Sequence, residues 1–326
     1  MSRYHPLFRW LVLAALVDWL VTRTLLRMAI FMPKSSLVIE IYRALGTLGQ
    51  FASILSAVLA IAILVWLSWQ AFSRPNRSPL ALAWLSLVGL SLVFMVLPPT
   101  GWLALTYHLI FLGSVLLLIG QSWVREYSFD KKVAATLVGV ALLAGGLYQT
   151  IPLVYHTAGL AGPPAMSGPV FNAGELFIPL SILALWWAYG QSSSIRAWLL
   201  GAIPALIFTA ARLASPSMTG ILAIWSTGMT LYLPWPLYTL SLWLAGVTVI
   251  ASLRRGDSAG LAVLLLIAGS YAPQLSTQAF LGLIALWLLA PTSPSPLPET
   301  WRQRSALTSE VLSRNVMNPQ VPPRRR

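Results

Sequence analysis

Residues 78–124, SPLALAWLSLVGLSLVFMVLPPTGWLALTYHLIFLGSVLLLIGQSWV, decide the fold of this chain. The stretch contains no Asp, Glu, Lys or Arg, and the sequence Pro-Pro-Thr-Gly at 98–101 interrupts it near the middle. A helix needs about 20 apolar residues to cross the hydrocarbon core of a bilayer. Pro and Gly break helices and form turns. We therefore predict two membrane-spanning helices, residues 79–97 and 101–121, joined by a tight turn.

The composition of the whole chain agrees with this membrane assignment. Of its 326 residues, 57% are hydrophobic and only 9% are charged, and the mean hydropathy is +0.76. About a quarter of the residues in a soluble domain are charged. The composition therefore excludes a soluble enzyme, a disordered chain and a fibrous protein. Cysteine is absent, which excludes disulfides, thiolate metal sites, iron–sulfur clusters and cysteine nucleophiles.

The same length and hydropathy criterion predicts an all-α polytopic membrane bundle of about ten helices. The predicted spans are residues 8–31, 45–71, 79–97, 101–121, 133–153, 174–190, 196–213, 235–253, 258–271 and 274–290. Together they form a predicted transmembrane domain, residues 1–298, whose last eight residues are a Pro-rich linker. Residues 299–326 are predicted to form a basic cytoplasmic tail that contains a short amphipathic helix.

Loop charge predicts the topology. If residues 217–233 do not cross the membrane, both termini are cytoplasmic and the Lys and Arg residues divide 16 inside to 5 outside. If that segment crosses and the C-terminus stays inside, the division falls to 13 against 8. The positive-inside rule favours the first topology. The segments 155–172 and 217–235 then lie on the outer surface, where the first is too rich in Gly and Pro for a helix.

The net charge of +13 does not indicate nucleic-acid binding. Six of the 21 Lys and Arg residues follow residue 300, and most others lie in short turns between apolar runs. This distribution is typical of cytoplasmic loops that contact anionic lipid. We predict a multi-pass protein of the cell inner (plasma) membrane, with the lipid bilayer as its partner and anionic lipid at the basic tail.

Polar residues within the spans are the candidate site, because ionised groups are costly in hydrocarbon. Asp18 lies about 15 Å along the first predicted helix, close to mid-bilayer. The complete set of candidate substrate or ion contacts is Asp18, Arg23, Arg27, His108, Glu175 and Arg212. In the predicted topology all of them fall in the middle or outer half of the membrane, which predicts a shared polar cavity open to the outside.

Each candidate also has a structural interpretation. Asp18 could form a buried hydrogen bond to Thr22, and Arg23 and Arg27 could extend to the outer headgroups. Glu175 is predicted at the start of a helix, where the dipole favours negative charge, and could form an ion pair with Arg212 that holds two helices together.

No cofactor is expected, because His108 and His156 are predicted at unequal depths in the membrane, which does not suit haem ligation. No metal is expected either, because no metal-binding spacing is present. No catalytic motif is found either, so no catalytic residue is assigned. Three functions remain: a transporter or permease for a small or lipid-like solute, a non-catalytic subunit that anchors or assembles other membrane subunits, and an enzyme for lipid-linked substrates at the outer leaflet.

Overall fold

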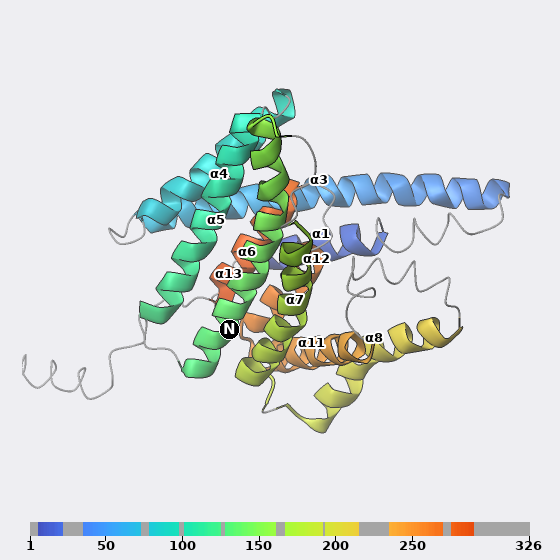
Figure 1. The fold of residues 1–326 in the computed structure, drawn as a ribbon. Coiled ribbons are helices and arrows are strands. Elements are labelled where there is room, and N and C mark those ends of the chain that lie inside the picture. The colour runs from blue at the N-terminus through green and yellow to red at the C-terminus, as the bar shows by residue number, and fades with distance from the viewer. Residues whose placement is uncertain are drawn as a thin grey trace, which may run out of the picture. The chain divides into compact units, whose positions relative to one another are not determined.

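A computed structural model describes residues 6–21, 35–72, 78–97, 101–124, 128–160, 167–191, 193–214, 235–269 and 275–289. These residues form helices and no strands (Figure 1). The helices are α1 (Pro6–Asp18), α3 (Ser36–Phe72), α4 (Ser78–Val96), α5 (Gly101–Val124), α6 (Phe129–Thr157), α7 (Ser167–Tyr189), α8 (Ile195–Ala214), α11 (Trp235–Arg255), α12 (Ala259–Gly269) and α13 (Leu275–Leu289). The segment 217–235, predicted to lie on the outer surface, falls outside the described residues except for Trp235, and the tail 299–326 lies outside them entirely.

A described helix overlaps each of the ten predicted spans, and four helical segments are long and apolar enough to cross a membrane. These four are Ser36–Phe72, Pro79–Val96, Gly101–Trp123 and Phe129–Thr157. Length and composition thus identify four candidate membrane-spanning helices, all in the first half of the chain. α4 and α5, two of these helices, lie on either side of residues 98–100, where the sequence predicts a turn.

Three helices begin at least four residues earlier than the predicted spans, and the local sequence explains each difference. α3 begins at Ser36 because the Ser35 hydroxyl accepts a hydrogen bond from the Val38 amide at 3.3 Å, which caps the helix. α6 begins at Phe129, with Asp130 in its first turn. α7 begins at Ser167 because Pro169 falls in the first turn of the helix, where its missing N–H is tolerated. The predicted loop 155–172 is therefore shorter, since α6 continues to Thr157.

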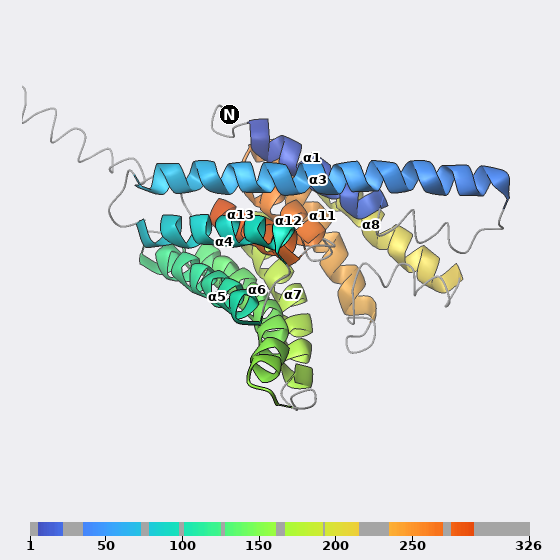
Figure 2. The ribbon, with the colours of Figure 1, turned by 90° about the horizontal axis from the view of Figure 1, so that it is seen from above.

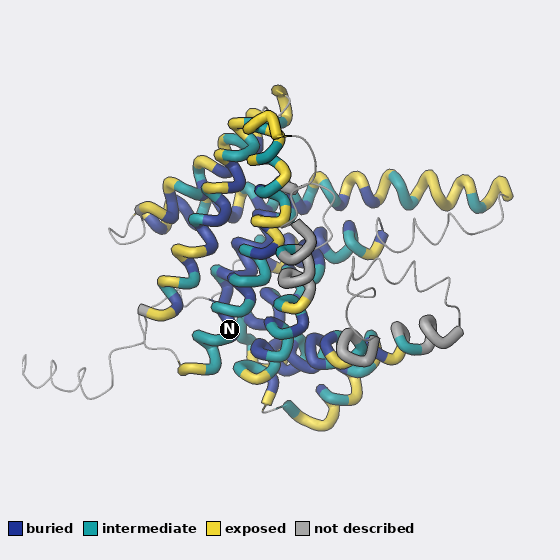
Figure 3. Tube along the Cα trace, viewed as in Figure 1, coloured by how far each residue is buried: buried dark blue, intermediate teal, exposed yellow. Residues whose placement is uncertain are grey.

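Two short helices, α12 and α13, have no exposed side chain among their described residues. α12 and α13 have 11 and 15 residues, and every residue from Ala279 to Leu289 in α13 is buried except the half-buried Trp287 (Figure 3). α13 contacts α12, α3, α5 and α6. Its sequence is apolar on all sides, as expected for a helix that has no solvent face. Because α13 is surrounded by protein, its length need not match the thickness of a bilayer.

The longest helix is α3, and its N-terminal half is the least covered part of the helical unit. Its 37 residues correspond to about 55 Å, whereas the hydrocarbon core is about 30 Å thick. In two perpendicular views this half extends past the neighbouring helices (Figures 1 and 2). Large apolar side chains are exposed on all its faces: Leu37, Ile39, Ile41, Tyr42, Leu48, Phe51, Ile54 and Val58.

The backbones of α8 and α11 approach each other closely at two glycine residues. A Cβ atom added to Gly246 would lie 2.5 Å from the carbonyl oxygen of Gly201. Two helices can approach this closely only where small residues face each other. Gly201 and Ala205 form a small-xxx-small pair in the sequence, and both are buried. Ala141 and Gly145 in α6 have the same small-xxx-small spacing but do not mark a close helix contact, because nothing lies within 4 Å of a Cβ added to Gly145.

Candidate functional site

Most buried hydroxyl groups bond within their own helix and are therefore poor site candidates. Ser68, for example, donates to the carbonyl of Leu64 at 2.7 Å, and Thr248 donates to the carbonyl of Leu244 at 2.8 Å. The hydroxyls of Ser91, Ser114 and Thr150 do the same. Such local bonds satisfy a polar group in an apolar environment without a partner on another helix. The other buried polar groups include the Asp18 carboxyl, the His108 imidazole, the Tyr107 hydroxyl and the indole nitrogens of Trp19, Trp84 and Trp186.

Asp18 is the buried carboxyl group. Its exposed fraction is only 3%, and it is the last residue of α1, directly before a π-helical turn at 19–21. α1 packs against α3 and α12. Asp18 thus lies in a protein-filled environment, where a carboxylate is costly unless polar groups or a cation compensate it. Thr22, Arg23 and Arg27 lie outside the described residues.

His108 is the buried imidazole, with an exposed fraction of 5%. It lies in α5, and its ring makes an edge contact with the ring of Tyr107 at a centroid distance of 5.7 Å. Tyr107 in turn contacts Phe94 of α4 at 5.8 Å. Within the described ranges no three His, Asp or Glu side chains lie together in a way that would hold a metal ion. His108 is therefore a candidate for a hydrogen-bonding role.

The antiparallel register of α5 and α6 places further polar residues at the level of His108. A Cβ added to Gly101 would meet Thr157, and one added to Gly139 would meet Ile119. The two helices run in opposite directions, so each step forward along α5 corresponds to one step back along α6. In this register Thr150 lies opposite His108. Thr150 is buried and follows Gln149 in α6.

Gln149 connects α6 to the central helix α13. Its side-chain nitrogen lies 3.4 Å from the amide oxygen of Gln278, and both residues are half-buried. We name His108, Gln149, Thr150 and Gln278 the polar layer. The sequence analysis missed the two glutamines because it considered only ionisable groups. Their signal was an amide side chain inside each of two predicted spans, 133–153 and 274–290.

The other two predicted site residues lie in helices whose described contacts do not bring them together. Glu175 is the ninth residue of α7 and not its first, so the predicted favourable interaction with the helix N-terminus is wrong. Arg212 is near the end of α8. α7 and α8 contact each other through Trp186 and Trp198 and diverge from there in both views (Figures 1 and 2). The side chains of Glu175 and Arg212 are not among those described, and their ion pair stays a prediction.

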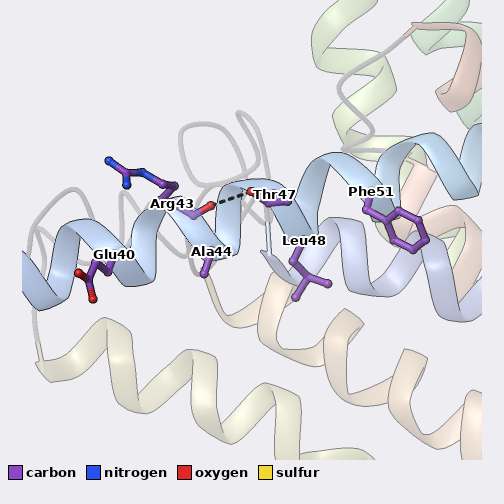
Figure 4. Close-up of a pocket in the computed structure, with 6 residues that line it drawn as sticks. All are labelled: Glu40, Arg43, Ala44, Thr47, Leu48 and Phe51. Carbon is purple, nitrogen blue, oxygen red and sulfur yellow. Dashed lines mark hydrogen bonds between the residues drawn. The ribbon is translucent and has the colours of Figure 1, made fainter.

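The predicted site residues do not line the pocket that the structure describes. An open groove of about 660 Å³ lies along the N-terminal half of α3 (Figure 4). Glu40, Ala44 and Leu48 point to the same side of the helix, and Arg43 points to the other. The full lining is Glu40, Arg43, Ala44, Thr47, Leu48 and Phe51. The groove is mainly apolar, with one carboxylate and one guanidinium at its outer end.

No family model, curated protein or solved structure matches this chain. The candidate site is therefore defined by its own geometry: Asp18 between α1 and its neighbours, and the polar layer between α5, α6 and α13.

Proposed function

We propose that this protein is a multi-pass membrane transporter for a small or lipid-like solute. The observation that carries the proposal is that Asp18 and His108 are buried inside a mainly apolar helical unit, with the half-buried amides of Gln149 and Gln278 in contact with each other. Polar and ionisable groups held inside a membrane bundle are costly and usually mark a substrate or ion pathway. Asp18 would be the coupling carboxylate, and the polar layer would donate and accept hydrogen bonds along the path. Arg23, Arg27, Glu175 and Arg212 are kept as proposed contacts on the outer side.

The proposed topology has ten membrane-embedded helices, with both termini on the cytoplasmic side of the inner membrane. It is supported by contacts between helix ends that the topology assigns to the same side. Phe8 at the start of α1 stacks on Trp287 at the end of α13 at 5.9 Å. The Ser258 hydroxyl at the start of α12 donates to the Leu288 carbonyl at 2.8 Å. Lys131 at the start of α6 lies over the ring of Tyr189 at the end of α7.

Uptake by proteoliposomes tests the proposal. Vesicles with the full-length protein and an imposed pH gradient are incubated with a mixture of amino acids, sugars, nucleosides and polyamines, and mass spectrometry measures what accumulates. We expect at least one solute to accumulate relative to protein-free vesicles, and Asp18→Asn to reduce the accumulation at least tenfold because the substituted group cannot bind and release a proton.

Asp130→Asn is the matched control, since it removes a carboxylate from the first turn of α6, outside the apolar interior. This variant is expected to transport like the unmodified protein. Undiminished uptake by Asp18→Asn would remove Asp18 from the mechanism, and a lack of accumulation for every solute class would contradict the transporter itself.

The N-terminal half of α3 favours a second candidate, a non-catalytic subunit of a larger membrane complex. Its apolar side chains are exposed on all faces along a helix that extends past its neighbours. A subunit of this kind would purify from native membranes in mild detergent as a particle much heavier than the 35.6 kDa chain. Phe51→Lys on this half, where the exposed fraction is 65%, would dissociate it. A monodisperse single chain would exclude this candidate.

A further inference from the structure

Side chains from α6 and α11 hold the turn between α7 and α8. The Arg255 guanidinium donates to the carbonyl oxygen of Tyr189, and the Arg254 guanidinium donates to the hydroxyl of Ser194. From α6, the Lys131 ammonium lies 5.6 Å from the centroid of the Tyr189 ring. We name these five residues the α7–α8 junction. Three cationic groups from two helices thus converge on six residues of chain, 189–194.

Only one of these cations is neutralised by a described carboxylate. Arg255 forms an ion pair with Asp257 at 2.8 Å. The Asp257 carboxylate also accepts hydrogen bonds from the Ser252 hydroxyl and from the Ala259 amide at the start of α12. Lys131 contacts an aromatic ring and Arg254 a hydroxyl group, and within the described part of the chain neither lies within 4.0 Å of a carboxylate.

Two further charged groups flank the junction. Asp130 precedes Lys131 in the first turn of α6, and the exposed Arg196 lies in the first turn of α8. When these two groups and Asp257 are included, the named positive charges outnumber the negative ones. Its charged groups are at least partly exposed, so an anion can approach them from solution or from the membrane surface.

Aromatic residues place the junction at the level of lipid headgroups. Trp186 and Trp198 lie about one helical turn inside the junction, on α7 and α8, with ring centroids 5.8 Å apart. The ring nitrogen of Trp243 on α11 donates to the Trp198 carbonyl at 2.9 Å and ties the third helix to this pair. Tryptophan is enriched where apolar helix leaves the hydrocarbon for water. Exposed Ile195, Leu199 and Leu253 extend the apolar surface beside the charges.

We propose that the α7–α8 junction binds the phosphate of an anionic phospholipid. Lys131 and Arg254 contact the phosphate oxygens, because they are the cations whose charge no described carboxylate offsets. The acyl chains lie on the exposed apolar side chains of α8 and α11. Basic sites between membrane helices bind lipid headgroups in this way. This site is distinct from the basic tail and does not depend on whether the protein transports a solute.

Native mass spectrometry of the full-length protein in mild detergent tests the proposal, with dioleoylphosphatidylglycerol as the anionic probe and dioleoylphosphatidylcholine as the zwitterionic one. We expect the unmodified protein to prefer the anionic lipid. Each basic residue near an anionic headgroup contributes about fivefold in affinity. The double variant Lys131→Gln/Arg254→Gln should therefore bind phosphatidylglycerol about 30-fold more weakly, with binding of phosphatidylcholine unchanged.

Two control variants separate the junction from general charge. Arg9→Gln/Arg43→Gln removes two exposed charges from α1 and α3, and Arg324→Gln/Arg325→Gln/Arg326→Gln removes three from the tail. Both should keep the affinity of the unmodified protein to within about twofold. A loss in either control as large as in the junction variant would overturn the proposal, because the binding would then reflect net charge alone.

A gain of affinity gives a test that misfolding cannot mimic. Asp257→Asn keeps an acceptor for the Ala259 amide but removes the negative charge that offsets Arg255. It should tighten phosphatidylglycerol binding about fivefold. Unchanged or weaker binding by this variant would contradict the site. Displacement of the lipid by millimolar inorganic phosphate would also overturn the proposal, since it would identify a site for free anions.

Discussion

Single glycine residues set how closely α8 and α11 approach. A Cβ at position 246 would meet backbone atoms of Gly201, and backbone cannot move aside as the end of a side chain can. We expect Gly246→Ala to destabilise the protein by about 1–3 kcal/mol, because overpacking at a rigid contact forces the helices apart. The loss is measured as a lower midpoint of thermal unfolding in detergent, followed by tryptophan fluorescence.

Gly145→Ala provides the matched control within α6. Open space surrounds its added Cβ, so the better helix propensity of alanine should stabilise the protein by about 0.5–1 kcal/mol. Equal shifts of the unfolding midpoint in the two variants would show that the α8–α11 contact does not depend on Gly246. The two outcomes have opposite sign, so they are distinguishable even when the absolute stability is unknown.

The sequence allowed single polar residues to be identified but not their partners. Asp18 and His108 stand out in apolar segments and are buried in the structure. The contact of Gln149 with Gln278 spans 129 positions of the chain, and no periodicity within either helix indicates it. Only the packing of α13 against α6 brings these amides together. Likewise, Gly201 has a recognisable small-residue spacing, whereas its contact with Gly246 requires knowledge of which helices cross.

Individual helices were predictable in position but less so in extent. Each of the ten described helices overlaps an apolar run of the sequence, so the runs located the helices. The ends of α3 and α6 were misplaced because the predicted spans stopped at charged residues. Helical hydrogen bonding continues past Glu40 and Arg43 to the Ser35 cap. The thickness of the hydrocarbon core sets the length of the apolar segment. The helix itself can continue beyond that segment, until its backbone is capped.

At the scale of the whole molecule, the topology can be tested with single introduced cysteines, because the chain contains no cysteine of its own. Leu160→Cys lies after α6 and Gln191→Cys after α7, and both positions are exposed. In the ten-helix topology they face opposite sides of the membrane. We expect a membrane-impermeant maleimide to label Leu160→Cys in spheroplasts and Gln191→Cys only after permeabilisation.

The unmodified chain supplies the background, which should be free of label. Labelling of both positions in intact spheroplasts would mean that α7 does not cross the membrane. The reverse pattern would invert the topology and place the α7–α8 junction outside. Either result would be visible as the presence or absence of a single mass increment on the protein.

The enclosure of α13 has a consequence for biogenesis. This helix follows all its described contact partners, α3, α5, α6 and α12, in the order of synthesis. In the proposed membrane topology, these helices therefore enter the bilayer before the helix that they surround has been synthesised. Their insertion and their final assembly are then separate events, because assembly requires residues 275–289. Early intermediates in that topology expose to the insertion machinery the apolar faces that α13 later covers.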